Sequence, residues 1–111
     1  MIVGIFSNAS TAEILLNNLS EADFDLSQVS IIMQDVRQRN LISHDGGPLK
    51  GLNPGDVSEK LVQMGLSSND AKLFQEKVSQ GKVLVAMVVS PESREAAIEM
   101  FHDQSVELFK G

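Results

Sequence analysis

Two stretches of the chain are apolar almost without interruption, and the rest of the pattern is arranged around them. Residues 83–89 are seven apolar residues in a row, four of them Val, and residues 1–6 form a second run that contains one glycine. A strand with one face in water alternates apolar and polar residues, so unbroken runs of this length predict strands buried on both faces. We therefore expect both runs to be central strands of a sheet.

Two further stretches have the mixed pattern of edge strands. Val29, Ile31 and Met33 place an apolar residue at every second position, and residues 105–110 alternate imperfectly. Because such strands bury mainly one face, we expect them at the edges of the same sheet.

Between the strands, apolar residues recur at helical spacing. A stripe from Ala12 to Leu19 predicts a helix over residues 10–20, with a capping-box pattern at Ser10. Residues 57–64 and 67–80 predict a pair of short helices separated by Gly65 and ended by Gly81.

A last helix is expected after the second apolar run. Ser90 and Pro91 are suited to the N-cap and first-turn positions, and the apolar stripe ends near His102. One face of this helix also carries three carboxylates, spaced by three and four residues.

The order of these elements predicts a single α+β domain over residues 1–111. Two pairs of strands, each joined through a helix, indicate a ferredoxin-like split βαβ fold with an antiparallel sheet in the order 4-1-3-2. The helical hairpin of residues 57–80 is then an insertion between strands two and three. A doubly wound parallel sheet is the alternative, although it needs helices on both faces and more strands than this chain supplies.

The ferredoxin-like arrangement leaves one apolar sheet face to be covered. Either the hairpin folds across that face, or a second copy of the chain packs there, or both. We therefore expect a homodimer or higher oligomer that uses one face of the strand at 83–89. The interface is predicted to contain Leu84, Ala86 and Val88, or on the opposite face Val83, Val85, Met87 and Val89.

Residues 34–55 are predicted to form a long flexible loop, because they hold four of the eight glycines and two of the three prolines. The loop also carries positive charge in an otherwise acidic chain. One interpretation is an anion or nucleotide site in which the amides of Gly46 and Gly47 assist basic side chains; the other is a solvated loop, or one that contacts a protein partner. No Walker or dinucleotide-binding glycine motif is present. The candidate anion-binding residues are Arg37, Arg39, His44 and Lys50.

Composition excludes several kinds of chemistry. The formal net charge of −6 disfavours nucleic acid as a partner, and the lack of cysteine excludes disulfides, thiolate catalysis and cysteine-ligated metals. We expect no cofactor, no metal and no membrane association. Since no secretion signal or membrane span is evident, a cytoplasmic location is expected.

The remaining polar clusters have simple structural interpretations. The two histidines each precede an aspartate, at His44 and His102, but nothing in the sequence brings them together as an acid–base or metal pair. His102 suits a helix C-terminus, where a cation is favoured. Glu92, Glu95 and Glu99 are expected to form a solvated helix face, and no catalytic residues are assigned.

Several of these positions resemble the small domain of bacterial general stress (heat-induced) proteins. The resemblance covers residues 1–33 and 57–110, and it rests on Val3-Gly4-Ile5-Phe6, the Ala/Leu helix that follows, Met64-Gly65-Leu66-Ser67, Ala71, Phe74 and Gly81-Lys82-Val83-Leu84-Val85. It implies a ferredoxin-like fold and a stress-linked role without a defined reaction. Many members have a long glycine-rich apolar segment where residues 34–55 lie, whereas this segment is short and polar, which disfavours membrane association.

Two functions from different classes follow as hypotheses. The first is a small soluble regulatory or interaction module that self-associates through its sheet. The second is a small ligand-binding protein or enzyme of the dimeric ferredoxin-like type, acting on an anionic small molecule through the loop residues.

Overall fold

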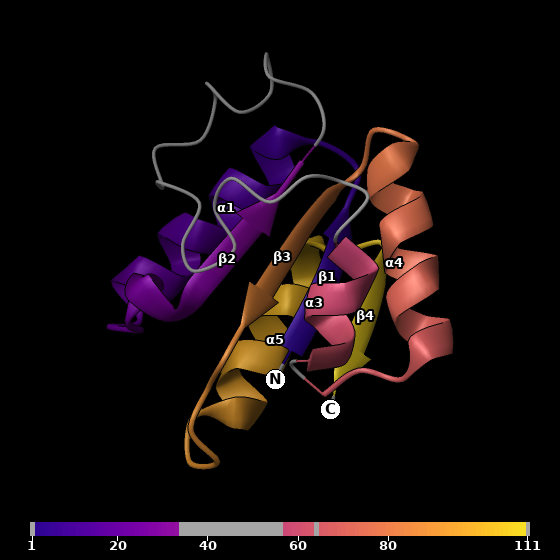
Figure 1. Cartoon of the computed structure of the whole chain (residues 1–111). Coiled ribbons are helices and arrows are strands. Elements are labelled where there is room, and N and C mark those ends of the chain that lie inside the picture. Colours follow the sequence, from indigo (N-terminus) through magenta and orange to yellow (C-terminus); the bar gives the residue numbers. More distant parts are fainter. Residues whose placement is uncertain (1, 34–56, 64, 111) are drawn as a thin grey trace.

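A four-stranded antiparallel sheet forms the centre of the computed structural model, which describes residues 2–33, 57–63 and 65–110 (Figure 1). The sheet order is β2-β3-β1-β4, which is β4-β1-β3-β2 when counted from the other edge. All three pairings are antiparallel, so the parallel alternative is wrong. The strands are β1 (Ile2–Phe6), β2 (Val29–Ile32), β3 (Val83–Met87) and β4 (Glu107–Lys110).

The two central strands are those with unbroken apolar runs. Every residue of β1 and β3 is buried, and the strands pair from Ile2 opposite Met87 to Phe6 opposite Val83. β3 ends at Met87, two residues before the end of its apolar run, because Met87 already pairs with Ile2, the first residue of β1. Val88 therefore leaves the ladder and is 52% exposed.

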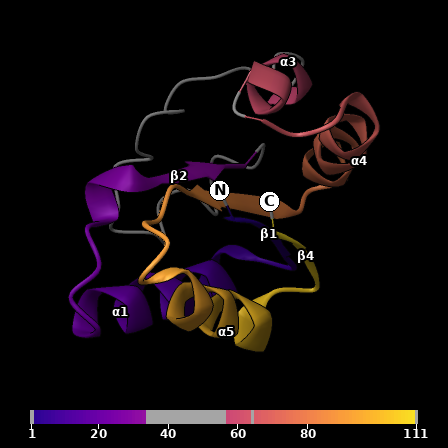
Figure 2. The same cartoon turned by 90° about the horizontal axis from the view of Figure 1, so that it is seen from below.

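Two helices cover one face of the sheet, α1 (Ala9–Glu21) and α5 (Arg94–Gln104), as Figure 2 shows. The N-cap of α1 is Asn8, whose side chain accepts a hydrogen bond from the Thr11 N–H at 3.0 Å. The capping box expected at Ser10 is therefore wrong, because Ser10 lies inside the helix. A short 3₁₀ helix, η1 (Leu26–Gln28), leads from α1 into β2.

The last helix begins later than the sequence indicated. Ser93 occupies its N-cap position, and Ser90 and Pro91 lie in the preceding connection. The Ser93 N–H donates to the Ser90 carbonyl oxygen at 3.1 Å, so a turn forms where the first helical turn was expected.

The hairpin of α3 (Val57–Gln63) and α4 (Ser68–Ser79) covers the opposite face of the sheet (Figure 2). Glycine ends both helices as predicted: Gly65 has φ +116° and Gly81 has φ +93°, values that favour a residue without a β-carbon. The Leu66 N–H bonds the Leu61 carbonyl oxygen at 3.0 Å, which completes the helix-ending motif of α3.

The sheet thus separates two apolar cores. The core on the α1 and α5 side includes Phe6, Leu15, Val85 and Phe101. The core on the hairpin side is built from Val3, Ile5, Ile32, Leu61, Leu66, Ala71, Phe74, Val78, Leu84 and Ala86. Of the alternatives for covering the second face, the hairpin is the one observed within a single chain.

Candidate functional site

A pocket of about 260 Å³ lies at the end of the sheet where β3 leaves it. One wall comes from the turn between α1 and η1, and the other from residues 87–93 between β3 and α5. The two walls are joined by a hydrogen bond of 3.4 Å from the Val88 N–H to the Gln28 carbonyl oxygen. Figure 1 shows the two backbone segments that supply these walls, the turn after α1 in purple and the stretch after β3 in orange.

The first wall is shaped by the way α1 ends. The Phe24 N–H donates to the Leu19 carbonyl oxygen at 3.0 Å and the Asp23 N–H to that of Ser20 at 3.1 Å, the pattern of a Schellman motif. Asp23 occupies the left-handed position with φ +65°, where the other two helix ends of this kind have glycine. A carboxylate therefore lines the pocket at a position where the backbone alone favours glycine.

Asp25 is the second carboxylate of the pocket, and its position is fixed by Ser27. The Ser27 hydroxyl donates to Asp25 Oδ1 at 2.7 Å and the Ser27 N–H donates to the same oxygen at 3.0 Å. These two hydrogen bonds lower the pKa of the Asp25 carboxyl below its ordinary value of 3.8, the hydroxyl bond contributing most. The side chain is therefore an anion at neutral pH.

The rest of the pocket is a mixture of apolar and neutral polar side chains. Phe24 on one wall and Met87, Val88 and Val89 on the other supply the apolar surface. Neutral hydrogen-bonding groups come from Gln28, Ser90 and Ser93. Apolar walls beside an oriented carboxylate are suited to a ligand that is itself apolar along one part and cationic at its end.

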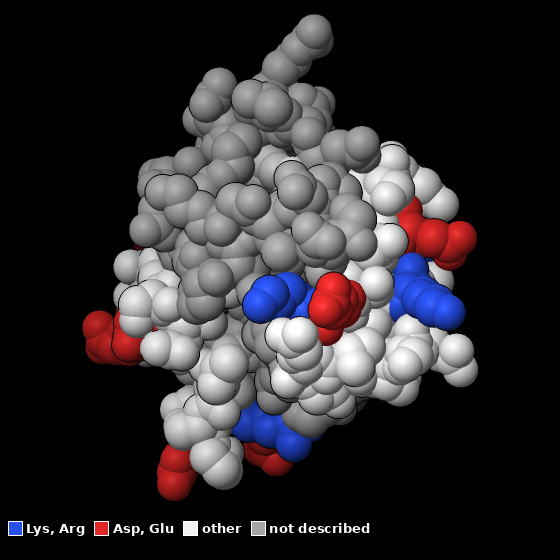
Figure 3. All heavy atoms as spheres, viewed as in Figure 1, with Lys and Arg blue, Asp and Glu red and all other residues white. Residues whose placement is uncertain are grey.

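Charge is distributed unevenly between the two helical layers. Eight of the twelve described carboxylate side chains lie on α1, the turn after it, the connection after β3 and α5, whereas Arg94 is the single described lysine or arginine of those segments. Over the hairpin, basic and acidic side chains lie next to one another (Figure 3). The pocket therefore belongs to the acidic part of the molecule.

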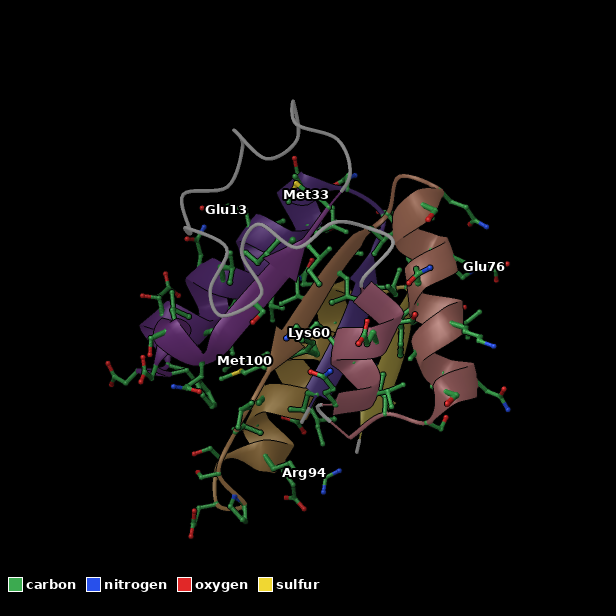
Figure 4. All side chains as sticks on the ribbon, viewed as in Figure 1. Glu13, Met33, Lys60, Glu76, Arg94 and Met100 are labelled. Atoms are coloured by element: carbon green, nitrogen blue, oxygen red, sulfur yellow. The ribbon has the colours of Figure 1, made fainter. Side chains whose placement is uncertain are left out.

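Figure 4 labels individual side chains from both helical layers. Lys60 and Glu76 extend from the two hairpin helices, and Arg94 lies at the lower end of the molecule where α5 begins.

A second hollow of about 270 Å³ lies on the hairpin, between Val62 of α3 and Lys72 of α4. Its lining contains both Glu59 and Lys72, so charge does not favour one kind of ligand there.

The predicted interface residues have different environments. Leu84 and Ala86 are 0% and 1% exposed because the hairpin packs on them, and on the other face Val83, Val85 and Met87 are buried under α1 and α5. Val89 is partly buried. Among the three residues of the first predicted interface, Val88 alone presents an exposed side chain, and it lies in the pocket.

The predicted anion-binding residues lie outside the described part of the chain. This holds for Arg37, Arg39, His44 and Lys50, and for the whole loop of residues 34–55. His102 is described: it is exposed in the last turn of α5, beside Asp103. Glu92, Glu95 and Glu99 are all exposed, as expected for a solvated face.

Within residues 2–33, 57–63 and 65–110, no three side chains of the kinds that bind metals lie close enough together to hold an ion. None of the helices in these ranges has the length and apolar character needed to cross a membrane.

From the sequence we assigned no function to Asp23, Phe24 and Asp25. A signal was present, because Asp23 and Phe24 lie three and four residues after the expected end of the first helix at residue 20, and a left-handed residue followed by an apolar contact is common near a helix end. The partner wall could not be inferred, since it required knowing where β3 leaves the sheet.

Comparisons of the chain with protein-family models, curated proteins and solved structures found no match. The structure itself shows an α+β protein with a four-stranded antiparallel sheet between two pairs of helices.

Proposed function

We propose that this chain is a regulatory or interaction module with a ferredoxin-like fold, which acts by binding protein surfaces, copies of itself included. The observation that carries the proposal is the open end of β3. There Val88 is 52% exposed and lines a pocket together with Phe24 and two carboxylates, at the rim of the core that lies under α1 and α5. Apolar surface that the chain leaves uncovered beside fixed charge is typical of a binding site for another protein.

The ferredoxin-like assignment is supported by the element order. A strand, a helix and a strand are followed by the inserted hairpin and then by a second strand, helix and strand. The resemblance to general stress proteins supports a stress-linked regulatory role. A cytoplasmic location and a dimeric state remain predictions of the same proposal.

Light scattering tests self-association. We expect the purified chain at high micromolar concentration to have the mass of a dimer or a larger oligomer. A strict monomer at that concentration would contradict self-association.

Two exposed valines provide a matched pair of variants for the same experiment. Val88 and Val106 are 52% and 57% exposed and lie toward opposite ends of the sheet. If the open end of β3 is the contact, Val88→Asp reduces the oligomer and Val106→Asp does not. Equal effects of the two variants would place the contact elsewhere.

A further inference from the structure

The pocket at the end of β3 is too small for a typical cofactor. Its volume is about 260 Å³, whereas sites for drug-sized ligands and cofactors usually measure about 300–1,000 Å³. A volume just below that range suits a single large side chain inserted from outside.

The charged side chains that line the pocket favour a ligand with a positive charge. Asp23 and Asp25 are both exposed and line the pocket, and no lysine or arginine is among its described lining residues. An anionic group would be repelled by both carboxylates, whereas a cation would gain from both.

One carboxylate oxygen is available to accept hydrogen bonds. Both bonds from Ser27 go to Oδ1 of Asp25, and within the described residues Oδ2 accepts none. Because Ser27 already holds the carboxylate in place, a ligand loses little free energy in ordering it.

The apolar walls select the shape of the ligand. Phe24 and Val88 line the pocket next to the carboxylates. Arginine has an aliphatic stem that packs on apolar surface, and its guanidinium is planar, weakly hydrated, and able to stack on an aromatic ring and bond a carboxylate at the same time. Lysine offers the stem and the charge, but not the planar stacking surface.

We propose that this pocket binds an arginine side chain of a partner protein, with its stem against Val88 and its guanidinium stacked on Phe24 and bonded to Asp25 and Asp23. This inference deepens the proposed function and rests on it. The pocket is the anchor point at which a partner inserts one side chain, as arginines commonly do at the centres of protein interfaces.

The test is a titration of the ¹⁵N-labelled chain followed by amide NMR shifts, with N-acetyl-arginine methylamide as the probe. We expect shifts confined to residues 23–28 and 87–93. The same blocked form of citrulline, which is neutral, should bind at least about threefold more weakly, and that of lysine should be intermediate. Absence of shifts in these two segments at millimolar probe, or equal binding of citrulline, would overturn the proposal.

Two variants distinguish binding in the pocket from a general attraction of cations to an acidic protein. Asp25→Asn should weaken arginine binding about two- to fivefold, the range expected for an exposed ion pair. Asp103→Asn makes the same change in net charge on α5, outside the pocket lining, and should leave the affinity unchanged. Equal losses in the two variants would overturn the assignment to the pocket. The dispersion of the amide spectrum checks that each variant is folded.

Two further probes identify the source of the cation. The pentapeptide acetyl-Gly-Ala-Arg-Ala-Gly-amide should bind at least as tightly as agmatine, the free decarboxylated amine. Tighter binding of agmatine would overturn docking of a protein side chain and favour a small free cation. The titrations are carried out at a chain concentration at which light scattering gives the mass of a monomer, so that self-association through the same surface does not compete with the probes. Failure of self-association and failure of the arginine pocket are then distinguishable.

Discussion

Phe101 of α5 packs directly against the backbone of Gly4 in β1. A β-carbon at position 4 would lie 2.9 Å from Cδ2 of Phe101 and 3.0 Å from Cε1 of Phe6. The two phenylalanine rings are themselves in contact, with centroids 6.2 Å apart and planes inclined at 58°. The glycine therefore sets how closely α5 approaches the sheet.

Gly4→Ala should destabilise the protein by about 1–3 kcal/mol, the usual cost of adding a methyl group to a filled core. Phe101 is fully buried and so cannot easily move away. The sign of the change in the free energy of unfolding is informative, because alanine in a strand without this contact would be favoured over glycine by about 0.5–1 kcal/mol. Urea unfolding measures the difference.

The control for this prediction is the same substitution in a Phe101→Leu background. With the ring removed, Gly4→Ala should cost clearly less, and the double-mutant cycle then gives the coupling between the two positions. Additive effects in the cycle would show that the ring does not set the requirement for glycine.

The centre of the fold could be predicted because burial on both faces leaves a direct trace in the sequence. Residues of β1 and β3 pack against helices on both faces of the sheet, so neither strand alternates between apolar and polar positions. The residues at which helices and strands begin and end are harder to predict from the sequence. Ser90 and Pro91 have the chemistry of a helix start, but the Ser90–Ser93 turn delays α5 until Arg94.

The candidate site could not be predicted because its walls come from parts of the chain far apart in sequence. Asp25 follows α1, and Val88 follows β3; they share a pocket only because β2 pairs with β3 so that Val29 lies opposite Met87. No local pattern contains that register. A hydrophobic run also cannot show where a strand loses its partner, which is why Val88 was expected to be within the strand.

The left-handed residue that ends α1 leads to a second stability prediction. Asp23→Gly should raise the free energy of unfolding by up to about 1 kcal/mol, because glycine adopts φ +65° without the penalty of a β-carbon. Part of that gain is offset by the greater freedom of glycine in the unfolded chain. Chemical denaturation measures it.

Gly81→Ala is the converse variant and should lose about 1–2 kcal/mol. A β-carbon there meets nothing within 4 Å, so the loss would report the backbone conformation alone. A destabilised Asp23→Gly protein would mean that the Asp23 side chain contributes contacts that outweigh the backbone term.

Neighbouring residues on α4 test whether the hairpin covers the sheet in solution. Phe74 is 4% exposed in the second core and Leu73 is 43% exposed. Phe74→Ala should cost about 3–5 kcal/mol, and Leu73→Ala about 1 kcal/mol or less. If the two substitutions cost the same in thermal or urea unfolding, the hairpin does not pack on Leu84 and Ala86 as described.

One side-chain hydrogen bond holds the start of α3 to α4. The Ser58 N–H donates to Gln75 Oε1 at 2.9 Å, so a residue of α4 serves as the cap for the shorter helix. Gln75→Ala should lower stability by about 1 kcal/mol. It should also speed hydrogen exchange of the Ser58 amide. The adjacent exposed Glu76→Ala is the matched control, and faster exchange at Ser58 in both variants would rule out the cap as the cause.

The ion pair between α4 and β4 should contribute little to stability. Lys77 Nζ lies 3.6 Å from Glu107 Oε1, and the two side chains are 28% and 41% exposed, so water screens the attraction. A double-mutant cycle with Lys77→Met and Glu107→Gln should give a coupling of about 0.2–1 kcal/mol. The coupling should shrink in 1 M NaCl, where the screening length falls to about 3 Å. A coupling that exceeds about 2 kcal/mol, or that ignores salt, would mean that the pair is shielded from solvent and fixes α4 over the edge of the sheet.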